Sequence, residues 1–182
     1  MATLYDQSVP ILIHYFNNFS AILKKAEEYA VQESSSSSDH PTKETLLTHR
    51  LRDDMLPLTF QIQACSNTAK FLNSRLAGGQ DVVLEDTEST FEELYTRIDR
   101  TIEILKSIDR EAYNKDWDKE FIMTTKAMGS FRFADRHTYV SQWVLPNFFF
   151  HYSTAYCILR NVGVPLNAFD FLAGVAHKVE GS

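Results

Sequence analysis

Residues 58–76 carry an apolar repeat that is typical of a helix packed inside a bundle. The repeat consists of Leu58, Ile62, Cys65, Ala69, Leu72 and Leu76, separated by alternating steps of four and three positions. These steps place the side chains on one face of an α-helix and form the seam along which neighbouring helices pack. Gly78 and Gly79 follow the repeat and are expected to end the helix.

Three further segments show helical periodicity, beginning near residues 8, 87 and 135. Their stripes are Val9, Leu12, Phe16, Phe19, Leu23, Ala26 and Ala30; Phe91, Leu94, Ile98, Ile102, Leu105 and Ile108; and Val140, Val144, Phe148, His151, Ala155, Ile158 and Val162. Four amphipathic helices predict an all-α fold, a helical bundle built as a single domain from residues 1–182. Pro146 lies inside the last stripe and is expected to bend or break that helix.

The connections between the helices are less regular. Residues 33–44 contain five consecutive serines and predict a mobile loop. Apolar residues that alternate with polar ones on both sides of Gly129 predict a small β-hairpin between the third and fourth helices, which could act as a lid. In the tail, Phe169 and Phe171 are expected to pack across the bundle.

Composition argues against several classes of partner. The chain has 18 Lys and Arg against 24 Asp and Glu, a net charge of −6, and no concentrated basic patch, so nucleic acid is not expected as a partner. No apolar run approaches the roughly 18 residues of a transmembrane helix, and the first residues do not form a secretory signal. With only two cysteines, we expect a cytoplasmic protein without a disulfide framework.

Three motifs together resemble the DinB-like superfamily, and within it a branch known only as a domain of unknown function. The motifs are Asp54-Met55-x-Pro57, then Glu85-Asp86-Thr87-Glu88-x-Thr90-Phe91, and finally Leu145-Pro146-Asn147-Phe148-x-Phe150-His151-x-x-Thr154-Ala155-Tyr156-x-Ile158-Leu159-Arg160. The resemblance extends over nearly the whole chain. It implies an antiparallel four-helix bundle that forms a homodimer, in a superfamily whose typical members hold a divalent metal ion with three histidines.

The histidines of this chain depart from that metal-binding pattern. Two histidines that bind a metal from one helix are usually four positions apart, on the same face. His14, His40, His49, His137, His151 and His177 contain no such pair. Related sequences often have a histidine nine positions before the one that matches His151, where this chain has Gln142. We therefore expect no metal ion and no other cofactor.

His151 is the strongest candidate for a catalytic residue. It occupies a stripe position that is otherwise apolar, where an imidazole can titrate near neutral pH and act as a general acid or base. Asp54 or Tyr156 could orient it. The alternatives are a core histidine that bonds to a backbone carbonyl or to Asp54, and an Asp54 that only caps the second helix.

Aromatic residues are concentrated around His151 on the fourth helix. They cannot all point inward, so some face a ligand pocket, capped by the hairpin, or a second subunit. The candidate ligand-binding residues are Trp143, Phe148, Tyr152, Gln142 and His49. Arg97 and Arg160 are expected to form structural salt bridges with acidic residues such as Asp86 and Glu88.

Two functions from different classes follow. In the first, the protein binds a hydrophobic small molecule in the bundle interior without a metal, and catalyses a redox-neutral step such as isomerisation, cyclisation or proton transfer. In the second, it is a non-catalytic homodimer whose aromatic surface, including Phe149 and Tyr152, forms the subunit contact. A metal-dependent DinB-like transferase is a third, weaker alternative.

Overall fold

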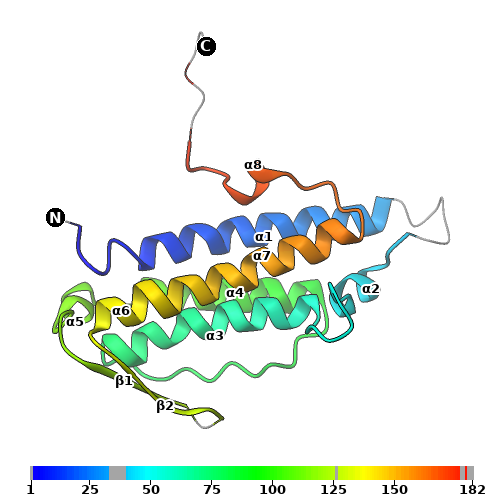
Figure 1. The fold of residues 1–182 in the computed structure, drawn as a ribbon. Coiled ribbons are helices and arrows are strands. Elements are labelled where there is room, and N and C mark those ends of the chain that lie inside the picture. Colours follow the sequence, from blue (N-terminus) through cyan, green and yellow to red (C-terminus); the bar gives the residue numbers. More distant parts are fainter. Residues whose placement is uncertain (1, 33–39, 126, 177–178, 180–182) are drawn as a thin grey trace.

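A computed structural model describes residues 2–32, 40–125, 127–176 and 179. Its four long helices form a bundle (Figure 1): α1 (Val9–Gln32), α3 (Leu58–Leu76), α4 (Phe91–Lys106) and α7 (Leu145–Asn161). Helix α3 packs against α7 and α4, and α1 packs against the same two helices from the opposite side. The predicted all-α bundle is confirmed.

The direction of the helices explains the longest connection in the described part of the chain. Helices α1 and α7 run in one direction, and α3 and α4 run in the other (Figure 1). Because α3 and α4 are consecutive and parallel, residues 77–90 must return along the length of the bundle to join them. We call this extended segment the strap; it runs beside α3 and α4 along the lower edge of Figure 1.

The centre of the bundle is filled by side chains from the predicted stripes. All six residues of the 58–76 repeat are buried. Across from them, Phe16 of α1 lies 5.1 Å from Phe148 of α7, and Phe19 lies 4.9 Å from Tyr152, measured between ring centroids. These four rings are fully buried, and their edge-to-face packing is the geometry that aromatic cores favour.

Short elements complete the fold. Strands β1 (Phe121–Thr125) and β2 (Gly129–Phe133) pair antiparallel with Met123 opposite Phe131, which confirms the hairpin. The short helices are α2 (Lys43–Thr48), α5 (Arg110–Asn114), α6 (Arg136–Tyr139) and α8 (Ala168–Phe171). Most of the predicted loop, residues 33–39, lies outside the described residues. Its last two residues, Lys43 and Glu44, begin α2, so the predicted loop extends too far.

The sequence predicts that Pro146 bends or breaks its helix, and the structure shows that the helix is not broken. Helix α6, a π-helical turn (Val140–Val144) and α7 follow one another directly from residue 136 to residue 161. In the wider turn, the Leu145 N–H bonds to the Val140 carbonyl, five residues earlier. Pro146 then falls in the first turn of α7, where a missing N–H costs little.

The tail after α7 packs on the bundle through one of the two aromatic residues that were predicted to do so. The Phe171 ring lies 4.4 Å from that of Tyr152, measured between centroids. Phe169 is 86% exposed, so its predicted packing is wrong. Within the described ranges, no helix is long and apolar enough to cross a membrane.

Candidate functional site

His151 is held by a residue of the neighbouring helix. Its Nδ1 lies 2.8 Å from Oε1 of Gln61, on α3. Gln61 is only 3% exposed, and its Nε2 donates to the Leu56 carbonyl at 2.9 Å. Since this bond fixes the amide with Oε1 toward the ring, Gln61 must accept and His151 must donate from Nδ1. The His151 ring therefore has a fixed orientation and a fixed tautomer.

The second ring nitrogen of His151 is left available. Nε2 has no hydrogen-bond partner among the described residues. It is not buried, so solvent can reach it. Partial burial lowers the pKa of His151 below its usual value, because desolvation disfavours the imidazolium. At neutral pH the ring is therefore uncharged, with a lone pair on Nε2 that can accept a proton.

Apolar groups surround this imidazole. The rings of Phe60 and Phe150 meet it edge to face, with centroids 5.8 and 5.0 Å away. Phe150 is 59% exposed and Leu56 is 46% exposed. His151, Gln61, Phe60 and Phe150 thus place one basic nitrogen beside accessible apolar surface where α3 meets α7, and we call these four residues the His151 site. Such a combination suits an apolar molecule with one polar or acidic group.

The residues predicted to assist His151 lie elsewhere. Asp54 is exposed in the loop before α3 and is not the described hydrogen-bond partner of His151, whose Nδ1 bonds to Gln61. Asp54 does not cap α3 either: the N-cap is Pro57, which has no side-chain cap bond, and the first N–H of α3 bonds to the His49 carbonyl. The Tyr156 hydroxyl points to the tail, where it donates to the Leu166 carbonyl at 3.4 Å.

The predicted ligand-binding residues are spread over the molecule. Phe148 and Tyr152 are core residues without exposed surface. Trp143 packs on the hairpin, with its ring centroid 5.6 Å from Phe131, while Gln142 faces solvent. His49 lies beside the other end of α7, where Nε2 is 2.9 Å from Oδ1 of Asn161. None of these residues bonds to His151, so the structure does not gather the predicted set around it.

The histidines do not fit the three-histidine metal site of the superfamily. In the part of the chain that the structure describes, no group of three or more His, Cys, Asp or Glu side chains is placed to hold a metal ion. His14, His49 and His151 each lie beside an amide group, contributed by Asn18, Asn161 and Gln61. We therefore derive no metal-dependent step.

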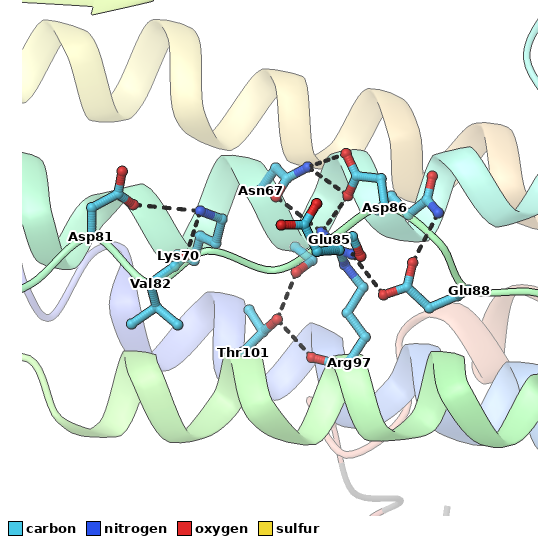
Figure 2. Close-up of polar contacts among 11 residues, drawn as sticks. Asn67, Lys70, Asp81, Val82, Glu85, Asp86, Glu88, Arg97 and Thr101 are labelled. Atoms are coloured by element: carbon cyan, nitrogen blue, oxygen red, sulfur yellow. Dashed lines mark hydrogen bonds and ion pairs between the residues drawn. The ribbon is translucent and has the colours of Figure 1, made fainter.

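A second polar cluster joins the strap to α3 and α4. Arg97 of α4 is 3% exposed and lies under the strap (Figure 2). Its guanidinium is 2.7 Å from carboxylate oxygens of both Asp86 and Glu88. It also donates to the Glu85 carbonyl at 3.0 Å and to Asn67 Oδ1 at 2.9 Å. The predicted salt bridges of Arg97 are confirmed, so the acidic motif is fastened to the bundle by this arginine.

Lys70 of α3 holds the other end of the strap. Its Nζ donates to the Val82 carbonyl at 2.7 Å and lies 3.5 Å from Asp81 (Figure 2). Burial lowers the pKa of Lys70. Arg160, in contrast, donates to the Val164 carbonyl and makes none of the described salt bridges, so its prediction is wrong. These contacts give the strap cluster a structural role and leave the His151 site as the candidate functional site.

Comparison with known proteins agrees with this fold. Residues 4–172 match the model of a domain of unknown function, DUF1993. The chain belongs to this family. It is also similar to a DinB family member protein from Shewanella denitrificans, whose crystal structure has 27% sequence identity and a TM-score of 0.80. The match covers 97% of this chain and 95% of that one. The DinB-like fold is thereby confirmed, while no curated protein matches the sequence.

Gln61 is the residue of the site that sequence reasoning missed. It immediately precedes Ile62, outside the apolar stripe of α3, so helical periodicity does not predict its burial. One signal was present: from Leu58 to Ala69 the helix contains no charged residue, and its polar residues are mostly amides and hydroxyls. Uncharged polar side chains along one helix are typical of buried, hydrogen-bonded positions.

Proposed function

We propose that this protein binds an apolar small molecule at the His151 site and that His151 moves a proton on it. The observation that supports this proposal is the hydrogen bond from His151 Nδ1 to the anchored amide of Gln61. This bond orients the ring and leaves Nε2 as the proton acceptor. The binding surface lies between α3 and α7, because side chains fill the bundle centre where the sequence suggested a pocket.

The chemistry that fits this site is a redox-neutral isomerisation or cyclisation. Nε2 takes a proton from one atom of the bound molecule and returns it to another atom, so that no electrons are gained or lost. Phe60 and Phe150 supply the apolar contact that keeps the molecule next to the imidazole. Neither a metal ion nor another cofactor is needed for such a step, and the residues of the site supply the whole proton relay.

Native mass spectrometry of the protein as purified tests this proposal. We expect a bound small molecule on the wild type, its loss from His151→Gln, and its retention by His137→Gln, which removes an exposed histidine. As a second readout, the proton-abstraction ring opening of nitrobenzisoxazole should be faster with the wild type than with His151→Gln. The proposal would be contradicted if His151→Gln retained the bound molecule as the wild type does and opened the ring at the same rate.

The outer surface of α7 supports a second candidate, the non-catalytic homodimer. Residues 138–159 contain no Lys, Arg, Asp or Glu in a chain in which 23% of residues are charged. Pro146, Phe150 and Cys157 are exposed on this helix. An uncharged surface with exposed aromatic rings is typical of the centre of a protein interface. Tyr152, which we had expected in the contact, is buried within the subunit.

Light scattering after size-exclusion chromatography tests the dimer. If α7 forms the contact, Phe150→Glu should be monomeric, whereas Val83→Glu, at a 73% exposed position on the strap, should stay dimeric. A wild-type monomer would refute this candidate.

Because both cysteines are free thiols, as is usual in a reducing compartment, we also propose that the protein is cytoplasmic.

A further inference from the structure

A separate hollow lies between α1, α7 and the tail that follows α8. Its volume is about 540 Å³, and it is lined by Ile11, His14 and Tyr15 of α1, Phe149 of α7, and Gly174 and Val175 of the tail. Small-molecule sites usually have volumes of about 300–1,000 Å³ and apolar walls with a few polar groups. We call this space the tail hollow; it does not include His151 or Gln61.

The tail wall of this hollow is held by side chains of α1. Asn18 is 8% exposed, and its Nδ2 donates to the carbonyls of Phe171 and Ala173 at 3.2 and 3.0 Å. The chain then turns at Gly174, whose φ of +75° is a conformation that favours glycine. A Cβ there would lie 3.2 Å from Cε1 of His14, so the backbone approaches the imidazole closely.

His14 provides the hollow with a hydrogen-bond donor. Its Nε2 lies 3.3 Å from Nδ2 of Asn18, whose two hydrogens are shared among this ring nitrogen and the Phe171 and Ala173 carbonyls. Because an amide nitrogen cannot accept, a proton on Nε2 would point at another donor, which favours the tautomer with its proton on Nδ1. Nδ1 has no hydrogen-bond partner among the described residues, and it is not buried. The donor is therefore accessible for an acceptor on a bound molecule.

The surroundings of His14 favour an anionic acceptor on a flat apolar molecule. Among the described residues, no Asp or Glu lines the hollow, and residues 7–23, which include the first part of α1, contain no charged residue, so these walls carry no negative charge that would repel a carboxylate. The rings of Tyr15 and Phe149 stand edge to face 4.8 Å apart and offer aromatic contact. From this geometry we infer that the tail hollow binds a monocarboxylate with an aromatic ring system, its carboxylate accepting from His14 Nδ1.

Titration calorimetry with naphthalene carboxylate tests this inference. We expect one molecule per chain with a dissociation constant of about 1 mM or tighter. His14→Phe keeps an aromatic ring but removes the donor, and should weaken binding about tenfold or more, as expected for a hydrogen bond to a charged group. Val175→Trp places an indole at the rim and should weaken binding by a similar factor.

Matched controls separate the hollow from the His151 site. Val83→Trp adds the same indole on the strap, and His151→Gln alters the other site. Both should bind the probe as the wild type does. Loss of binding in His151→Gln alone would assign the probe to the His151 site and overturn the inference. So would equal binding by the wild type, His14→Phe and Val175→Trp, or a wild type without saturable binding. A dissociation constant that rises with protein concentration would show that a second chain covers the hollow, which also contradicts a ligand site.

Discussion

Replacing Arg97 by methionine should loosen the strap and destabilise the whole bundle. The Arg97 side chain is 1% exposed, and it pairs with Glu88, 11% exposed, and with Asp86, 51% exposed. Removing one partner of a buried ion pair costs about 3–5 kcal/mol, because the other charge stays buried without compensation. The pair with the half-exposed Asp86 contributes much less. Glu88 also keeps one bond, from Gln63 Nε2.

We therefore expect Arg97→Met to lower the free energy of unfolding by about 3 kcal/mol, at the low end of that range. For a domain of this size, such a loss lowers Tm by roughly 6–12 °C. Urea unfolding monitored by circular dichroism measures it. A glutamate-specific protease should also cut the variant faster at Glu85 and Glu88, since both lie on the strap.

The matched control is Arg100→Met. Arg100 lies on the same helix, but its side chain is 54% exposed and pairs with the exposed Glu103. This change should cost less than about 0.5 kcal/mol. If Arg97→Met changed stability as little as Arg100→Met does, the strap would not depend on its buried arginine, and our account of the acidic motif would be wrong.

Three further results are expected. Because the folded state lowers the pKa of His151, the unfolded chain takes up a proton first as the pH falls below about 6.5, and this favours unfolding. Between pH 7.5 and pH 5.5, urea unfolding should therefore show a larger loss of stability in the wild type than in His151→Gln. Ellman's reagent should label the exposed Cys157 of the native protein but not Cys65, which is buried and whose pKa is raised by desolvation; protection of Cys157 as well would indicate that a second subunit covers α7. Gly163 has a φ of +94°, and a Cβ there would lie 3.0 Å from the Tyr29 hydroxyl. Gly163→Ala should therefore lower the free energy of unfolding by about 1–3 kcal/mol, measured with urea. An unchanged urea midpoint would contradict this prediction.

The bundle was predictable because burial imposes a period on the sequence. Side chains that recur at steps of three and four positions share one face of a helix, and every member of the 58–76 repeat, from Leu58 to Leu76, is indeed buried. Pro146 shows the limit of this reasoning. A proline predicts a disturbed helix but not its form, and the π-turn before it depends on hydrogen bonds that the sequence does not specify.

The candidate site was predictable only in part. His151 stood out because it interrupts an apolar stripe, but its partner lies 90 positions away on another helix. Which side chain reaches it depends on the relative rotation and height of α3 and α7, and helical periodicity does not determine these. The sequence suggests Asp54 as the partner, just before α3, whereas the buried amide of Gln61 makes the contact.

The most direct test of the account is nitrogen NMR of His151 in the wild-type protein, assigned by comparison with His151→Gln. We expect a ring that is protonated at Nδ1 and unprotonated at Nε2 at neutral pH, with a pKa below the usual value of about 6.5. Replacing Gln61 by leucine should remove the preference for this tautomer. A ring protonated at Nε2, or a pKa at or above the usual value, would contradict the claim that His151 is a preset proton acceptor.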